Sequence, residues 1–257
     1  MVSIPQELVN EIIGYLSFGP RKSLSNYSLV ARSWVYPCQK RLFRSIRIPP
    51  WKLQTWVGGC LSKSDAPLSY VRHLACGSED LLFTGRSPNR AGYSLCSLRP
   101  THFNLRNTRI LLPPQQIELI AGFEPTLSHV TLSRCRISKS ALVGFLNFFP
   151  KLEYLCLSTG FSFLDPNGLP PPIDRSSLKE LSIEGGAEFP PRVFADLLSL
   201  GLRFDALVLR PSQARFSQTR FINNIMTAFG ERVRRLKLPR IDGGMCILPH
   251  PCRVDPW

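Results

Sequence analysis

Three of the four histidines in this 257-residue chain occupy equivalent places in a repeating pattern. His73, His102 and His129 follow one another at intervals of roughly 25 to 29 residues. Imidazole nitrogens are common zinc ligands, so three neighbouring histidines could share a metal ion or hinder one another's protonation. No Asp, Glu or Cys stands among them. We therefore interpret them as solvated histidines on a polar surface and predict no metal site.

The sequence offers no motif for catalysis or for cofactor binding. It contains no G-x-S-x-G, no P-loop, no G-x-G-x-x-G and no H-E-x-x-H. The eight cysteines include no C-x-x-C pair, and Cys246, His250 and Cys252 are too sparse for a zinc knuckle. We predict that the chain is not an enzyme, that it has no catalytic residue and that it needs no cofactor.

The histidines belong to a repeat that follows the leucine-rich pattern L-x-x-L-x-L-x-x-N/C-x-L. The segment LSHVTLSRCRI, which starts at Leu127, fits this pattern at every fixed position and places Cys135 at the Asn/Cys position. Further matches are YVRHLAC, PTHFNLRNTRI, LEYLCL, LKELSI, FDALVL and VRRLKL, whose repeat starts are residues 71, 100, 152, 178, 204 and 233. Their spacing of roughly 25 to 29 residues is typical of leucine-rich repeats, whereas unrelated short strands would not keep a near-constant interval.

Helix-like segments lie between the predicted strands. They are PPQQIELIAGF, SKSALVGFLNFF, PPRVFADLLSL and QTRFINNIMTAF, whereas FLDPNGLPPPIDRSS reads as a surface loop. Strand–loop–helix units of this length bury their apolar faces only by stacking on one another. We therefore predict an α/β fold, in which residues 70–241 form a leucine-rich-repeat solenoid with parallel strands on its concave face and helices outside.

Residues that alternate with the buried positions of each strand should line the concave face. One column holds His73, His102, His129, Tyr154, Glu180, Ala206 and Arg235, and the next holds Ala75, Asn104, Thr131, Cys156, Ser182, Val208 and Lys237. A third holds Gly77, Arg106, Ser133, Ser158, Glu184, Arg210 and Pro239. From these columns we predict contacts to a target at His102, Asn104, His129, Thr131, Tyr154, Glu180, Glu184, Arg210, Arg235 and Lys237.

The first 48 residues do not follow the repeat. Their apolar stripe at helical spacing consists of Leu8, Val9, Ile12, Ile13 and Leu16. Two or three more short helices and a strand should follow. A segment this short, without a disulfide or metal motif, rarely folds alone. The rest of the chain or another protein must therefore cover its apolar surface.

The segments IPQELVNEIIGYL, SLVARSW and RLFRSIRI, in this order, resemble an F-box. An F-box is the short helical module by which substrate receptors dock onto the Skp adaptor of cullin–RING ubiquitin ligases. The resemblance covers about residues 3–48, and Ile4 replaces the first residue of the L-P-x-E-L opening. It implies that Pro5, Leu8, Leu16, Val30 and Trp34 lie at or near the adaptor interface. The alternative is a helical cap on the end of the solenoid.

An F-box followed by leucine-rich repeats implies a non-catalytic substrate-recognition subunit of an SCF-type ubiquitin ligase. Its partners would be the Skp adaptor, through it the cullin–RING ligase, and an unknown target protein. We expect the module at 1–48, a linker at 49–69, the solenoid at 70–241 and an irregular tail at 242–257. A scaffold that uses its F-box outside any ligase is an alternative.

The formal net charge of +14 suggests an acidic partner, and nucleic acid is the obvious alternative to a protein. The mixed charges of the concave columns argue against nucleic acid. The N-terminus does not resemble a secretory signal, and no apolar run approaches ~18 residues. We therefore expect a protein of the cytoplasm or nucleus with reduced thiols and no membrane partner.

Overall fold

The computed structural model describes residues 4–16, 21–48, 68–77, 98–110, 122–164, 178–185 and 191–211, with shorter stretches at 223, 225–227, 235–239 and 245–248. The helices are α1 (Gln6–Leu16), α2 (Arg21–Tyr27), α3 (Arg32–Leu42), α7 (Lys139–Phe148) and α8 (Pro191–Ser199), with a 3-10 helix η2 (Leu68–Tyr70). The long strands are β1 (Ser45–Ile48), β2 (His73–Gly77), β3 (His102–Arg106), β5 (His129–Ser133), β7 (Tyr154–Ser158), β9 (Leu178–Gly185), β10 (Phe204–Pro211), β11 (Arg235–Pro239) and β12 (Met245–Leu248). Among these helices, none has the length and apolar character that crossing a membrane requires.

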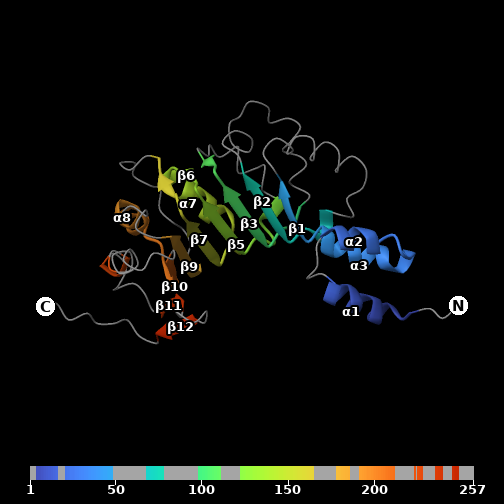
Figure 1. The fold of residues 1–257 in the computed structure, drawn as a ribbon. Helices are drawn as coiled ribbons and strands as arrows, with labels where there is room; N and C mark the ends of the chain where they lie inside the picture. The colour runs from blue at the N-terminus through green and yellow to red at the C-terminus, as the bar shows by residue number, and fades with distance from the viewer. Residues whose placement is uncertain are drawn as a thin grey trace, which may run out of the picture.

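The long strands form one sheet, and the chain advances along it one strand at a time (Figure 1). Strands β1 to β11 pair in parallel, and β12 pairs antiparallel with β11. Parallel neighbours need a crossover connection, which α7 provides before β7 and α8 provides before β10. The predicted α/β class is therefore confirmed as far as a large parallel sheet with crossover helices.

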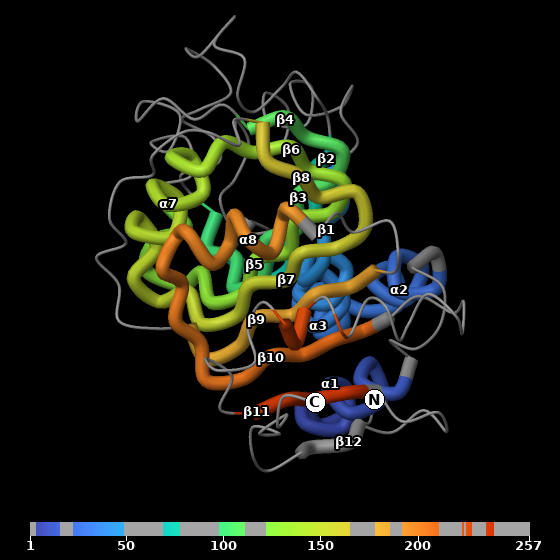
Figure 2. The backbone as a smooth tube through the Cα atoms, turned by 90° about the vertical axis from the view of Figure 1, so that its left-hand side faces the viewer, coloured from blue at the N-terminus to red at the C-terminus, as the bar shows by residue number. Residues whose placement is uncertain are grey.

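The register of the sheet aligns equivalent residues of the repeat, as the sequence pattern predicts. One aligned row is Leu74, Phe103, Val130, Leu155, Leu181, Leu207 and Leu236, and a second is Cys76, Leu105, Leu132, Leu157, Ile183 and Leu209. Every member of both rows is buried. They define the core face of the sheet, and Figure 2 shows α7 and α8 close together beside the strands that they connect. Residues of both helices belong to the same hydrophobic core as the two rows.

Short strands follow β3, β5 and β7 and form a second sheet. These strands, β4 (Arg109–Ile110), β6 (Arg136–Ile137) and β8 (Ser162–Phe163), also pair in parallel. The chain reaches each of them through a residue with positive φ: Asn107 (51°), Arg134 (52°) and Gly160 (74°). The left-handed turn therefore recurs at the same place in three consecutive units.

Cys135 occupies the Asn/Cys position of its unit and is fully buried. Its thiol donates hydrogen bonds to the carbonyl oxygens of Leu105, at 3.3 Å, and Ser133, at 3.4 Å. Burial raises the pKa of this thiol to about 11. The predicted structural role of Cys135 is confirmed, because it joins the turn after β5 to the preceding strand.

The N-terminal helices have a small core of their own, formed by Val9, Ile13, Leu24 and Cys38. A two-residue turn then leads from α3 into β1, whose residues pair with β2 from Ser45 to Ile48. Figure 1 shows α1, α2 and α3 at the β1 end of the sheet. The predicted boundary at residue 48 therefore falls at the end of the first strand of the sheet, which belongs to the predicted N-terminal module.

Several predicted segments lie outside the described residues. They are most of the linker (49–67), most of the helix-like segment at 113–123, most of the Pro-rich loop (165–177) and much of the last predicted helix (218–229). The tail predicted to be irregular contributes β12 at Met245–Leu248. An antiparallel strand there satisfies the backbone N–H and C=O groups on the outer edge of β11.

Candidate functional site

A row of stacked rings crosses four strands on the face of the sheet opposite the core face. The ring centroids of His73 and His102 are 4.2 Å apart, those of His102 and His129 are 4.0 Å apart, and those of His129 and Tyr154 are 4.1 Å apart. The register pairs these residues directly, and neighbouring strands lie only ~4.8 Å apart. We call this surface the histidine face.

Hydroxyl groups hold two of the imidazoles. The Thr101 hydroxyl lies 2.9 Å from Nδ1 of His102, and the Ser128 hydroxyl lies 2.8 Å from Nδ1 of His129. Each hydroxyl also donates its hydrogen to a backbone carbonyl, Thr101 to that of Arg72 at 3.2 Å and Ser128 to that of Thr101 at 3.3 Å. A hydroxyl has one hydrogen, so it accepts from Nδ1–H of the imidazole and leaves Nε2 as a hydrogen-bond acceptor.

The surroundings of the imidazoles keep them neutral. Burial, then the charges of His129, His73 and Arg44, lower the pKa of His102 to about 4. Burial and the charge of Arg44 also lower the pKa of His73. Burial lowers the pKa of His129 as well, although two nearby carboxylates oppose that shift. At neutral pH the histidine face therefore presents uncharged rings with acceptor nitrogens.

The stacked geometry does not suit a metal ion. The rings of His102 and His129 are tilted by only 14°, so their Nε2 lone pairs run side by side and do not converge. Within the described residues, no group of three or more His, Cys, Asp or Glu side chains could hold a metal ion.

The predicted target-contact residues all lie on the histidine face. They are His102 and Asn104 on β3, His129 and Thr131 on β5, Tyr154 on β7, Glu180 and Glu184 on β9, Arg210 on β10, and Arg235 and Lys237 on β11. Four of the charged members form two ion pairs, since Lys237 lies 2.7 Å from Glu180 and Arg210 lies 2.7 Å from Glu184. Arg235 is exposed and forms no ion pair with any described residue, so the charges at the β9–β11 end of this face are compensated only in part.

Three residues of the columns on β9 and β10 are not accessible to a ligand. Ser182, Ala206 and Val208 are buried on the histidine face. The side chains of Glu180 and Lys237 belong to the strands on either side of β10, so their ion pair must pass above that strand. This pair covers the small apolar residues beneath it.

The exposed large hydrophobic side chains of the described residues all belong to the N-terminal helical region. They are Ile4, Leu8, Ile12, Tyr15, Leu29, Val30 and Tyr36. Two exposed residues of α1 directly precede buried ones: Leu8 is 50% exposed and Val9 is 0%, while Ile12 is 38% exposed and Ile13 is 0%. The broad apolar stripe predicted for this helix is therefore divided between its own core and solvent.

The residues that the resemblance places at an adaptor interface differ in exposure. Pro5, Leu8 and Val30 are exposed. Trp34 is half-buried and packs against the small N-terminal core, so this ring also supports the fold. Leu16 is the last residue of α1, and its side chain lies outside the described residues.

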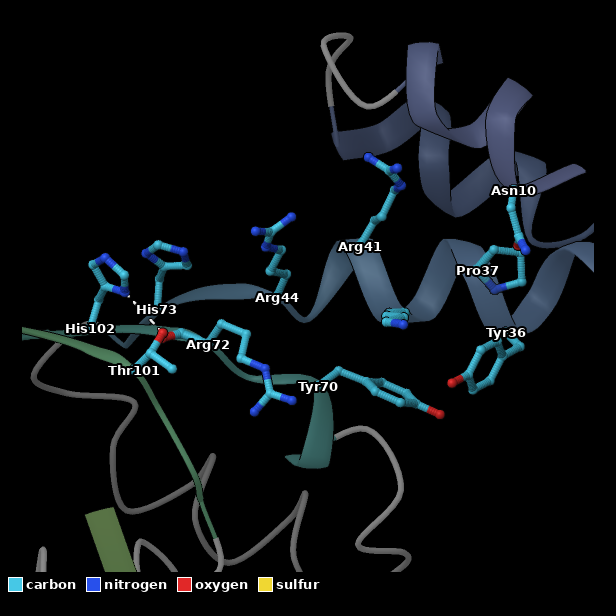
Figure 3. A pocket seen from close by; sticks show the side chains of 11 residues that line it. Asn10, Tyr36, Pro37, Arg41, Arg44, Tyr70, Arg72, His73, Thr101 and His102 are labelled. Carbon is cyan, nitrogen blue, oxygen red and sulfur yellow. Dashed lines mark hydrogen bonds between the residues drawn. The ribbon is translucent and has the colours of Figure 1, made fainter. Parts of the chain in front are cut away.

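A pocket of about 660 Å³ lies between α3 and the first strands of the sheet (Figure 3). Its lining residues are Asn10, Tyr36, Pro37, Lys40, Arg41, Arg44, Tyr70, Arg72, His73, Thr101 and His102. Among the described residues of this lining, four are permanent cations and none is acidic. We call this the basic pocket, and it adjoins the histidine face because His73 and His102 belong to both.

Sequence reasoning missed the basic pocket because its residues come from four distant segments of the chain. The repeat contained one signal that could have indicated part of this pocket. Arg44 directly precedes β1, and Arg72 directly precedes β2, so the two arginines occupy equivalent places in neighbouring strands. Their backbones meet there, because the amide groups of Arg72 and His73 both donate to the carbonyl oxygen of Arg44. Aligning β1 with the repeats would have placed Arg44 and Arg72 side by side on neighbouring strands.

No protein-family model matches this chain, and no curated protein matches it either. The partners of the molecule must therefore be inferred from its own surfaces. Three are available: the exposed apolar residues of the N-terminal helices, the histidine face and the basic pocket.

Proposed function

We propose that this chain is a non-catalytic substrate receptor of an SCF-type ubiquitin ligase. In this proposal the N-terminal helices act as an F-box that docks on the Skp adaptor, and the histidine face binds a target protein. Ubiquitin transfer would then be performed by the assembled ligase, and this chain would hold the target close to it.

The exposure pattern of α1 is the observation that carries the proposal. Leu8 and Ile12 remain in solvent although their neighbours Val9 and Ile13 fill a core. Burying one such side chain contributes about 1.5–3 kcal/mol. A helix that keeps a second apolar face in water is typical of a segment that binds a partner, because exposed apolar surface marks interaction sites.

The repeat supports the second half of the proposal. We propose that the parallel strands belong to a leucine-rich-repeat solenoid, since the aligned apolar rows, the recurring left-handed turn and Cys135 all follow its pattern. Such repeats offer an extended binding surface. The histidine face combines aromatic rings, acceptor nitrogens and paired charges, which suit the polar and aromatic recognition of a protein target.

Co-purification of the full chain with the Skp adaptor tests the proposal. Leu8→Asp and Val30→Asp place a charge at exposed apolar positions, so both variants should fold and should lose the complex. Ala195→Asp is a matched control, because it adds the same charge at an exposed position of α8. Circular dichroism and urea unfolding of each variant confirm that the fold is intact.

Three results would count against this function. A wild-type chain that folds but forms no complex would show that the N-terminal helices serve only the chain itself. Loss of the complex in Ala195→Asp to the same degree as in Leu8→Asp would show that the effect of the charge is unspecific. A complex that forms without changing the turnover of any bound protein would identify a scaffold instead of a ligase receptor.

A further inference from the structure

We infer that the basic pocket binds a small molecule that carries two or more phosphate groups. The site is formed by Lys40, Arg41 and Arg44 from the end of α3 and the turn after it, and by Arg72 from the residue before β2. In Figure 3 the side chains of Arg41 and Arg44 extend to one side and that of Arg72 to the other, and the rings of Tyr36 and Tyr70 lie near each other.

The cations of the basic pocket differ from two that are paired on the histidine face. There Lys237 pairs with Glu180 and Arg210 pairs with Glu184. Lys40, Arg44 and Arg72 are exposed and form no ion pair with any described residue. All three line the basic pocket, and an anion from outside would be attracted to their positive charge.

The neighbouring imidazoles show that this field is positive. The charge of Arg44 contributes to the lowered pKa of both His73 and His102, after burial in each case. A positive potential that disfavours protonation of two wall residues also favours a bound anion. The effect reaches the histidine face, so an anion in the basic pocket would raise the pKa of both imidazoles.

The shape of the basic pocket suits a compact ligand. Its volume of about 660 Å³ lies within the range of small-molecule sites. The rings of Tyr36 and Tyr70 meet edge to face, with centroids 5.5 Å apart, and Nζ of Lys40 lies 6.0 Å from the Tyr36 ring centroid. These contacts preorganise one wall, while the planar guanidinium groups can bind phosphate oxygens through paired hydrogen bonds.

The number of charges favours more than one phosphate group. A phosphorylated side chain of a protein carries about −1.5 to −2 charges at neutral pH. Three exposed cations of the basic pocket, Lys40, Arg44 and Arg72, form no ion pair with a described residue, so a single phosphate would leave part of their positive charge uncompensated. A soluble di- or triphosphate group would match it more closely.

Calorimetric titration of the full chain with inorganic tripolyphosphate tests this inference. Arg44→Gln and Lys40→Gln should each weaken binding about tenfold or more, because each removes a charged hydrogen-bond donor. Arg109→Gln is the matched control, since it removes one exposed arginine from β4, on the other sheet. A peptide with one phosphoserine, titrated in parallel, should bind more weakly than tripolyphosphate.

The inference fails if tripolyphosphate does not bind or if Arg109→Gln weakens binding as much as Arg44→Gln. It also fails if the phosphoserine peptide binds as tightly as tripolyphosphate, which would assign the site to a phosphorylated protein. The test is independent of adaptor binding, because Leu8→Asp should leave the affinity for tripolyphosphate unchanged. The proposed function and this site can therefore fail separately.

Discussion

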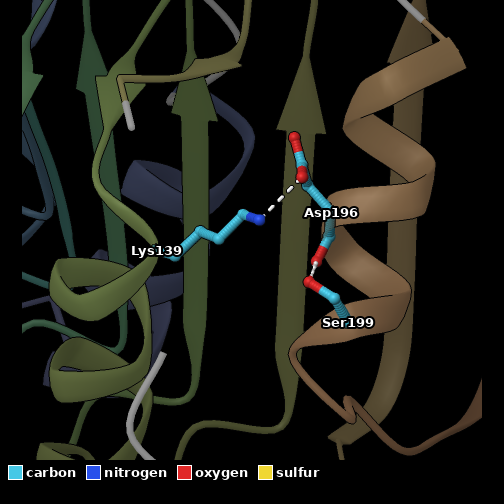
Figure 4. A network of polar contacts seen from close by, with 3 residues as sticks. All are labelled: Lys139, Asp196 and Ser199. Carbon is cyan, nitrogen blue, oxygen red and sulfur yellow. Dashed lines mark hydrogen bonds and ion pairs between the residues drawn. The ribbon is translucent and has the colours of Figure 1, made fainter. Parts of the chain in front are cut away.

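The ammonium nitrogen of Lys139 lies 2.7 Å from a carboxylate oxygen of Asp196, and the two side chains retain only 7% and 11% of their accessible surface (Figure 4). Lys139 begins α7 and Asp196 lies within α8, so the pair joins the two crossover helices. The hydroxyl of Ser199 donates to the backbone carbonyl of Asp196 at 2.7 Å. Charges this deeply buried are tolerated only as a pair, because removing either from water is costly.

Breaking this pair should destabilise the fold strongly. Lys139→Met should lower the free energy of unfolding by about 3–5 kcal/mol, because the carboxylate of Asp196 remains buried without its counterion. Urea denaturation measures the change. The double variant Lys139→Met/Asp196→Leu should recover much of the loss, since it removes both charges.

An exposed pair provides the control. Lys179 lies 2.6 Å from Glu153, but these side chains are 60% and 38% exposed. Lys179→Met should therefore change the free energy of unfolding by at most about 1 kcal/mol. Equal losses for Lys139→Met and Lys179→Met would show that burial does not determine the contribution of the inner pair.

The two apolar faces of α1 should respond differently to truncation. Ile13→Ala should lower the free energy of unfolding by about 2–5 kcal/mol, because it opens a cavity in the small N-terminal core. Leu8→Ala should change it by less than about 0.5 kcal/mol, because that side chain is half in solvent. Urea denaturation of both variants measures the two changes in the free energy of unfolding. A large loss for Leu8→Ala in the isolated chain would mean that this side chain packs within the molecule.

The histidine row should make stability depend on pH. The pKa of His102 is about 4 in the folded chain, against an ordinary value of 6.5. Between these pH values the unfolded chain binds more protons, so the free energy of unfolding should decrease as the pH falls from 6.5 towards 4. The stabilising effect is fully present above pH 6.5. Unfolding in urea at a series of pH values measures it.

The charged and titratable groups around His102 set the control for this prediction. Arg44 and His73 face it from the preceding strands and His129 from the following one, with Glu153 and Glu180 acting on His129. His102→Phe keeps a stacked ring without a titratable nitrogen and should flatten the pH profile between 4 and 6.5. His129→Gln should raise the pKa of His102, which NMR titration can follow. An unchanged profile in His102→Phe would assign the pH dependence to other groups.

The left-handed turn before β8 should not accept a side chain. Gly160 has φ of +74°, and an added Cβ would lie 3.1 Å from Cγ of Arg134. Gly160→Ala should therefore cost more than the about 1–2 kcal/mol of the backbone conformation alone. Gly201→Ala separates the two effects, because Gly201 has φ of +69° but no atom within 4 Å of the added Cβ. If Gly160→Ala and Gly201→Ala lowered the stability equally in thermal unfolding, the contact with Arg134 would not contribute to the cost.

The sequence pattern predicts the sheet and its register well. An apolar residue at every second position of each strand, repeated at a near-constant interval, leaves one alignment that buries Leu132 beside Leu105 and Leu157. The stacked histidines follow from the same alignment. Ser138 also predicts the start of α7, where its hydroxyl accepts from the amide group of Ala141 at 3.0 Å.

Features that depend on long side chains could not be predicted in this way. The pairing of Glu180 with Lys237 skips one strand, so no neighbour rule predicts that it covers Ala206. Lys139 and Asp196 meet only because two helices pack side by side, and each residue alone resembles an ordinary surface charge. The half-burial of Trp34 likewise depends on the angle between helices, which apolar spacing does not encode.

The direct passage from α3 through Phe43 and Arg44 into β1 has a mechanical consequence. A partner bound at Leu8 on α1 and a target bound at His102 on β3 would be connected through packed helices and paired strands, because the short turn after α3 leads directly into β1, which pairs with β2 and through it with β3. Their separation and mutual orientation would then be set by strand spacing and helix packing. The molecule would therefore hold a bound target in one fixed orientation relative to the partner bound at α1.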